Sequence, residues 1–158
     1  MSFLIKTQGQ KKAVWCIFDL RIKGDICDLD VMQIRSQSLA AHLVGCKRVI
    51  LFAATLGAAF DRELQKQSRL SPARAYDLQM QGLREIEAFC DTLCTELEKE
   101  QGKMLKKRFS PGYGDLSLEV QREIFRVLDP AKHIGLCLSD SCVMTPSKSV
   151  TAFVGVEE

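Results

Sequence analysis

The sequence lacks long apolar runs, and no stretch approaches the roughly 18 apolar residues that cross a membrane as a helix. Its first residues, MSFLIKTQGQKK, turn polar at once and lack the apolar core of a secretory signal peptide. An excess of charge of one sign is also missing, because 22 basic and 20 acidic residues leave a formal net charge of +2. Such a balance creates no strong field for nucleic acid or an anionic membrane. We therefore expect a cytoplasmic protein with no nucleic-acid or membrane partner.

Familiar catalytic motifs are missing as well. No glycine-rich phosphate loop follows a predicted strand, and neither H-E-x-x-H nor G-x-S-x-G occurs. The chain has two histidines, His42 and His133, and neither has an obvious nucleophile beside it in sequence. A triad that joins His133 to Ser139 or Cys142 is a minor alternative to a surface imidazole. We predict no catalytic residue and no metal site.

The seven cysteines include no C-x-x-C pair. Their odd number and the lack of an export signal argue against a disulfide framework or a zinc ribbon. Cys90 and Cys94 are four apart in a helical pattern and therefore share one face of a helix. We favour small apolar packing residues here, and a reactive or metal-binding thiol pair is the open alternative.

The 158 residues are 46% hydrophobic and 27% charged, which is the composition of one globular domain with a substantial core. Apolar segments at 13–20 and 47–53 predict strands, and the C-terminal third predicts two or three short ones. Segment 23–30 predicts a turn region. Helices are predicted over 32–44, over 58–69, from Ser71 onward, and over 118–128. Strands at both ends with helices between them indicate an α+β domain.

The longest predicted helix begins at Ser71-Pro72, with serine as N-cap and proline at the first helical position. Its apolar stripe consists of Leu83, Ile86, Cys90, Leu93 and Leu97. In the preceding helix, Phe60, Leu64 and Leu70 are expected to point inward. Gly102 marks a possible early stop. Basic residues from Lys103 to Arg108 gather at the expected helix end, where the dipole favours them, and they form either a docking face or a solvated end.

The segment from Arg108 to Gly114 is the most informative part of the sequence. Pro111-Gly112 favours a type II turn, because glycine accepts the positive φ at the third position. Two glycines flank Tyr113, so the backbone there can lie close to a ligand. Arg108 can offer a planar fork of donors to a carboxylate. Such a loop can hold a small, partly anionic molecule, and a plain structural turn is the alternative.

Glu87 adds a carboxylate at the edge of the apolar stripe. It lies only about 20° from Cys94 around the helix axis. A carboxylate at that place reaches solvent, pairs with a basic residue, or faces a hydroxyl or amine of a ligand. The pattern leaves these three alternatives open.

In these segments the sequence resembles the activation domain of cobalamin-dependent methionine synthase, in the version that occurs as a separate small protein. The resemblance runs from about Ala13 to Val156. It rests on KRVILFAATLGAAFDRELQKQSRLSPARA, IEAFCDTLCTELEKE, KKRFSPGYGDLSLEVQREIFRVLDPAKHIGL and LSDSCVMTPSKSVTAFVGV. It implies one α+β domain over 1–158, with a twisted, mainly antiparallel sheet, a long central helix and shorter helices. The N-terminal helical segment of the family is expected to be absent.

The resemblance also implies a function. The family binds S-adenosylmethionine and presents its sulfonium methyl to the corrinoid of methionine synthase. When the corrinoid is accidentally oxidised to cob(II)alamin, one electron from a flavodoxin-type donor plus this methyl restores methylcobalamin. The cobalamin is expected on the partner, methionine synthase or a related corrinoid protein, because this chain lacks the cobalt-ligating D-x-H-x-x-G sequence.

The S-adenosylmethionine site that the resemblance implies consists of Glu87, Arg108, Ser110, Pro111, Gly112 and Tyr113. Arg108 would contact the carboxylate of the cofactor, and Tyr113 would line its adenosine or methionine portion. Ser110 and Gly112 would offer backbone groups. Methyl transfer from a sulfonium to cob(I)alamin needs placement rather than an acid or a base, which agrees with the missing catalytic motifs.

Two alternatives come from other classes of protein. The acidic residue and the tyrosine pair that also bind S-adenosylmethionine in the full synthase domain have no match here. This motivates a docking or sensing module for a corrinoid methyltransferase that delivers no methyl itself. A thiol redox or zinc protein built on Cys90 and Cys94 is the third hypothesis.

Overall fold

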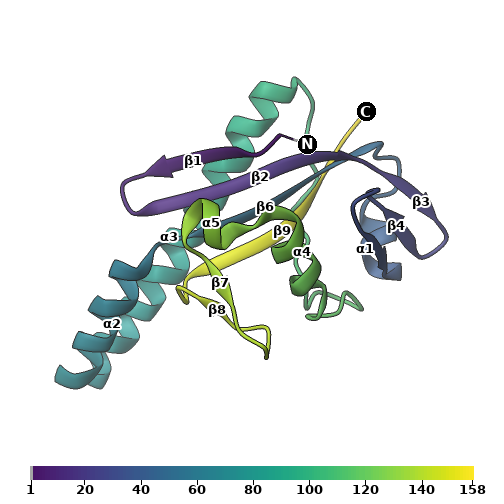
Figure 1. The fold of residues 1–158 in the computed structure, drawn as a ribbon. Helices are drawn as coiled ribbons and strands as arrows, with labels where there is room; N and C mark the ends of the chain where they lie inside the picture. The colour runs from purple at the N-terminus through teal and green to yellow at the C-terminus, as the bar shows by residue number, and fades with distance from the viewer. Residues whose placement is uncertain (1) are drawn as a thin grey trace.

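The computed structural model describes residues 2–158, and its centre is a four-stranded antiparallel sheet (Figure 1). The strands are β1 (Leu4–Gln8), β2 (Lys11–Asp19), β6 (Arg48–Thr55) and β9 (Ser149–Val156). They lie in the order β1-β2-β6-β9, and each pairs with its neighbour in antiparallel orientation. The two apolar segments expected to be strands are β2 and β6.

Side chains alternate between the two sides of this sheet, so that each side carries its own apolar layer. Phe52 and Val154 pack on the side that the longest helix covers. Leu51 and Phe153, their neighbours in sequence, pack on the opposite side with the short helices. Strand β6 is thus buried on both sides, which explains its uninterrupted apolar sequence.

The structure differs from the sequence prediction at the turn region 23–30 and the helix 32–44. Three short strands and a short helix lie here: β3 (Arg21–Lys23), β4 (Ile26–Asp28), β5 (Gln33–Arg35) and α1 (Gln37–His42). Each strand has only three residues, too few for an alternating pattern to be distinguished from a helical one. Ser36 ends the strand pattern and caps α1, since its hydroxyl accepts a hydrogen bond from the Leu39 amide.

Helices α2 (Ala58–Leu70) and α3 (Pro72–Gln101) form a hairpin whose loop end projects beyond the sheet (Figure 1). The predicted start of α3 is confirmed, and its end is the earlier of the two that the sequence left open. Ser71 caps its start, and Gly102 ends it in the left-handed conformation. We expected the basic residues from Lys103 onward at the end of this helix. They lie instead in an extended segment that follows it, because the helix ends at Gly102.

The inward direction predicted for Leu70 and Leu83 is wrong, because both side chains are exposed. No further layer from residues 2–158 covers the projecting part of the hairpin, and α2 has no buried residue. The rest of the stripe on α3, from Ile86 to Leu97, is buried against the sheet as predicted.

The turn before β9 ties the helical hairpin to the sheet. The backbone N–H and the hydroxyl of Ser147 each donate a hydrogen bond to the Asp61 carboxylate at 2.8 Å. The adjacent Lys148 donates to the side chain of Gln79 on α3. The M-T-P-S-K-S-V stretch therefore has a structural role here.

The remaining elements lie between α3 and β9: α4 (Val120–Leu128), α5 (Pro130–Ile134), β7 (Cys137–Leu138) and β8 (Met144–Thr145). Helix α4 ends before Asp129-Pro130, as predicted. Strand β1 has no counterpart in the prediction, since it is an edge strand with mostly exposed residues. Together these elements give the predicted α+β fold, a mainly antiparallel sheet with one long helix and shorter ones. Among residues 2–158 no helix combines the length and apolarity needed to cross a membrane.

Candidate functional site

A bulge lies in the extended segment that follows α3. Residues 104–109 run along the outer edge of β9, and two bridges join the segment to this strand, Leu105 with Val156 and Phe109 with Phe153. Between the two bridges the segment advances by four residues while β9 advances by three. One extra residue opposite a partner strand defines a β-bulge.

The bulge turns Arg108 toward α3. Lys107 and Arg108 together oppose Val154 of β9. With regular alternation Arg108 would share a side with Lys106, whose Nζ donates to the Val44 carbonyl just after α1, 2.8 Å away. The extra residue reverses the alternation, so the guanidinium lies on the side of the sheet that α3 covers.

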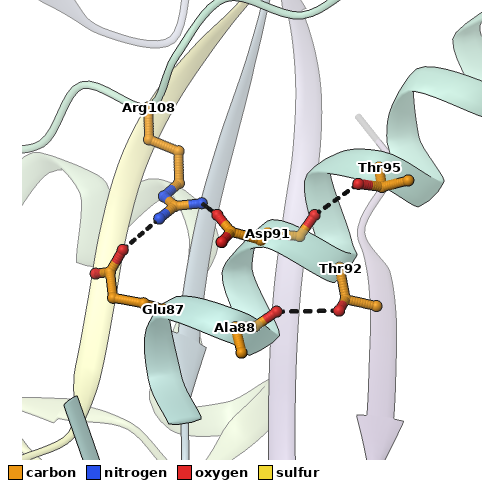
Figure 2. A network of polar contacts seen from close by, with 6 residues as sticks. All are labelled: Glu87, Ala88, Asp91, Thr92, Thr95 and Arg108. Carbon is orange, nitrogen blue, oxygen red and sulfur yellow. Dashed lines mark hydrogen bonds and ion pairs between the residues drawn. The ribbon is translucent and has the colours of Figure 1, made fainter. Parts of the chain in front are cut away.

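Arg108 binds two carboxylates on one face of α3 (Figure 2). Its Nη2 donates to Oε2 of Glu87 at 2.6 Å, and its Nη1 donates to Oδ1 of Asp91 at 2.7 Å. Glu87 and Asp91 are one helical turn apart, so their carboxylates lie next to each other and each takes one arm of the fork. Of the three alternatives left open for Glu87, the structure shows the one with a basic partner.

The guanidinium is the least exposed member of this group. The exposed fraction of the side chain is 19% for Arg108, against 60% for Glu87 and 71% for Asp91. Burial alone would lower the pKa of Arg108, but the hydrogen bond to Asp91 and the charge of Glu87 outweigh it and raise that pKa above its ordinary value. The cation is therefore permanent, and it is fixed in position from two sides.

An open groove of about 550 Å³ lies beside this cation. It is lined by Asp91, Cys94, Thr95, Glu98, Leu105, Lys106, Lys107, Arg108 and Tyr113. One wall is the exposed edge of α3, and the other is the bulged segment with the loop after it. The structure thus brings Arg108 and Tyr113 together in one groove, with Glu87 one turn away on the bordering helix.

The loop that carries Tyr113 forms the predicted turn. The Tyr113 amide donates to the Ser110 carbonyl at 3.0 Å, and Gly112 has a φ of 97°, which a type II turn requires at that position. The Gly112 amide donates to the Leu116 carbonyl at 2.8 Å, within the loop itself. Pro111 is buried beneath the turn. The ligand contacts expected of Ser110, Pro111 and Gly112 remain predictions.

Asp115 fastens the end of this loop to the start of α1. Its carboxylate accepts from the Ser36 hydroxyl, from the Gln37 amide at 2.9 Å and from the Ser38 amide at 3.0 Å. Amides at a helix N-terminus stabilise negative charge, and these bonds lower the pKa of Asp115 to about 2. Gly114 fits closely here, because a Cβ on it would lie 2.4 Å from the Ser38 hydroxyl oxygen.

The two cysteines of α3 have different surroundings. Cys90 is fully buried in the apolar layer, and burial raises the pKa of its thiol to about 12. Cys94 is half-buried and lines the groove, and burial raises its pKa as well, opposed by Arg108. Raised pKa values keep both thiols protonated and poorly nucleophilic, which favours the packing interpretation. Within residues 2–158 no group of three or more His, Cys, Asp or Glu side chains is placed to hold a metal ion.

Neither histidine belongs to a triad in the part of the chain that the structure describes. The His133 ring lies 5.1 Å from the Phe3 ring, and the Ser139 hydroxyl bonds to the Val143 amide. The His42 ring contacts the bulge instead: its Nε2 donates to the Lys107 carbonyl. The groove offers charged side chains and one aromatic ring, which can bind and orient a polar ligand.

Asp91 is the site residue that the sequence prediction misses. A carboxylate four residues after Glu87 on a predicted helix is a signal that could have found it. Lys107 and Cys94 also line the groove, but their places depend on the bulge and on the packing of α3, which no short pattern reveals.

Comparison with solved structures finds a similar fold that covers most of the chain. It is the crystal structure of the MetH reactivation domain bound to AdoHcy, with a TM-score of 0.72 at 16% sequence identity, and the match covers 92% of this chain. The matched region is 58% of the length of that domain. No model of a known protein family matches the sequence, and no curated protein matches it. The similarity confirms the fold that the resemblance implies.

Proposed function

We propose that this protein binds S-adenosylmethionine in the groove beside Arg108 and presents its methyl group to a corrinoid bound by another protein. The observation that carries the proposal is the fixed guanidinium of Arg108, which shares a groove with Tyr113 on a fold similar to one that has been crystallised with AdoHcy. The recipient is cobalamin-dependent methionine synthase or a related corrinoid protein in the cytoplasm, with a flavodoxin-type protein as electron donor.

The groove supplies the contacts that such a ligand needs. A guanidinium with several donors binds the α-carboxylate of an amino acid, and an exposed ring such as Tyr113 packs against a purine or a methionine chain. Glu87 and Asp91 can accept hydrogen bonds from a ribose hydroxyl or an ammonium group. The groove is open, so the sulfur end of a bound ligand remains accessible to a second protein.

The chemistry agrees with the residues that are present. Methyl transfer breaks the S–CH₃ bond, leaves its electron pair on sulfur as a neutral thioether, and joins the methyl to the reduced cobalt of the partner's corrinoid. A sulfonium is already a good leaving group, so the chain needs no general acid, base or nucleophile. Its contribution is placement, which can lower a barrier by about 7–11 kcal/mol.

Calorimetric titration of the purified chain with S-adenosylmethionine tests binding. We expect saturable binding, and we expect Arg108→Ala to weaken it by about 1.5–3 kcal/mol, because a charge-assisted contact is lost. Arg35→Ala is the matched control, since Arg35 also pairs with a carboxylate, Asp25, but on the distant β3–β5 sheet. Equal affinity of the Arg108 variant and the native chain would disprove this site.

Single-turnover transfer tests the second half of the proposal. S-adenosylmethionine with a radiolabelled methyl is mixed with this chain, a corrinoid methionine synthase and a one-electron reductant. Label on cobalt that depends on this chain is the expected result. Binding without any dependence of transfer on the chain would favour the docking or sensing module instead.

A further inference from the structure

The charges at the groove are unevenly exposed, and this gives the α3 side of its mouth a negative character. Two carboxylates hold one guanidinium, and both are more than half exposed while Arg108 is mostly covered. A ligand that approaches from solvent therefore meets carboxylate oxygens before it meets the cation. One negative charge remains in excess within the group formed by Glu87, Asp91 and Arg108.

Two other charged residues of the groove already form hydrogen bonds with backbone groups. Glu98 accepts a hydrogen bond from the Leu105 amide at 3.0 Å, and Lys106 donates to a backbone carbonyl outside the groove. Lys107 is exposed on the opposite wall, on the bulged segment. The α3 wall is thus acidic near Asp91, and the facing wall is basic near Lys107.

Asp91 is the carboxylate of the pair that lines the groove. It uses Oδ1 for Arg108, and among the described residues no hydrogen bond reaches its Oδ2. Its backbone carbonyl accepts from the Thr95 hydroxyl at 3.0 Å, one turn further along (Figure 2). Asp91 therefore has a carboxylate oxygen available to a positive group of a ligand that sits on Arg108.

We propose that Asp91 is a specificity-determining residue that makes the groove prefer the cationic sulfonium ligand over its neutral thioether product. This inference rests on the proposed function. S-adenosylmethionine and S-adenosylhomocysteine differ by one methyl group and one positive charge, located at sulfur. The α-ammonium group is common to both compounds, so only the sulfonium charge can distinguish them. A carboxylate near the sulfur attracts that charge in the first compound and finds no charge there in the second, so the ligand is held more tightly before its methyl leaves than after.

The test is the ratio of two dissociation constants, measured by calorimetry for both compounds with the native chain and with Asp91→Asn. The exchange keeps the shape of the side chain and removes its charge. Because Asp91 is mostly exposed, its attraction to a unit charge a few ångström away is screened nearly as in bulk water and corresponds to roughly a threefold to tenfold preference. We expect the native chain to bind S-adenosylmethionine more tightly by about that factor at low salt. We expect Asp91→Asn to lose the preference and Asp91→Glu to keep it.

Asp77→Asn is the control, because it removes the same charge from the same helix about 20 Å away along its axis. If Asp91 has only a structural role, Asp91→Asn will weaken the binding of both compounds equally and leave the ratio of their dissociation constants unchanged. That result would overturn this inference but not the proposed function. A preference that does not shrink at high salt would also overturn it. Failure of the native chain to bind either compound would overturn the proposed function itself.

Discussion

The Nε2 atom of His42 donates a hydrogen bond to the carbonyl oxygen of Lys107, 2.7 Å away, and the His42 ring lies 5.1 Å from the ring of Phe109. The last residue of α1 thus holds the bulge that carries Arg108. A bulge leaves the backbone groups of its extra residue without partners in the ladder. His42 supplies one of those partners from another layer of the protein.

We therefore expect His42→Ala to weaken ligand binding although this side chain does not line the groove. Loss of a hydrogen bond of about 0.5–1.5 kcal/mol should loosen the bulge and raise the cost of ordering Arg108. His42→Gln, which keeps an N–H donor, should restore part of the affinity. Calorimetry with S-adenosylmethionine and urea unfolding measure the two effects. A variant that loses stability but binds as well as the native chain would show that the bond has no part in positioning Arg108.

The Asp115 carboxylate makes the free energy of unfolding depend on pH in the acidic range. Its pKa of about 2 in the folded chain lies below the ordinary value of 3.8, so its contribution is complete above that value and is lost as the pH falls toward 2. We expect Asp115→Asn to be less stable than the native chain at pH 5–7, and we expect the difference to shrink between pH 4 and 2. Urea unfolding at several pH values measures this. Asp140→Asn, an exposed loop carboxylate, is the control, and an equal pH dependence for both variants would contradict the role of Asp115.

Gly82 allows α2 and α3 to approach closely. A Cβ at this position would lie 2.4 Å from Cζ of Phe60 and 3.1 Å from Cε of Lys148. Alanine gains up to about 1 kcal/mol of helix propensity over glycine, but overpacking costs about 1–3 kcal/mol, so we expect Gly82→Ala to destabilise the chain by about 1 kcal/mol. The double variant with Phe60→Leu should recover this loss. If Gly82→Ala is as stable as the native chain in thermal unfolding, the contact is less tight than the structure indicates.

The thiols should react in an order set by burial. Cys137 is exposed, Cys94 is half-buried, and Cys90 is fully buried with a pKa near 12. Under native conditions at pH 7–8 we expect an aromatic disulfide reagent to modify Cys137 within minutes, Cys94 more slowly, and Cys90 only after denaturant is added. Mass spectrometry of peptides from a time course identifies the modified residues. Early modification of Cys90 would revive the hypothesis of a redox-active pair.

The sequence predicts the parts of this protein that depend on neighbours in the chain. The start of α3 at Ser71 and its end at Gly102 follow from capping preferences, and the turn at Pro111-Gly112 follows from the φ that glycine accepts. The pairing of Glu87 with a base was one of three open alternatives, because the helix pattern places the carboxylate but not its partner. The helix caps and the turn, unlike that partner, need no knowledge of the tertiary structure.

Other parts depend on distant segments and were missed. Strand β1 is an edge strand with mostly exposed residues, so it shows no apolar alternation. Leu70 and Leu83 fit an apolar stripe, but whether a stripe is buried depends on whether another layer reaches it. The bulge at Lys107 cannot be predicted from the sequence of its own segment. It is defined by two residues that oppose one residue of β9, so it depends on how the two segments pair.

That bulge also bears on how related chains are to be compared. The way in which residues 105–109 pair with β9, not their chemical identity, decides which layer receives the guanidinium. A chain with the same R-x-x-P-G-Y letters that paired regularly with β9 from Leu105 onward, without the bulge, would send its arginine toward α1 and leave Glu87 and Asp91 without a counter-ion. Two sequences can therefore agree at every letter of this motif and still differ in whether a binding site exists.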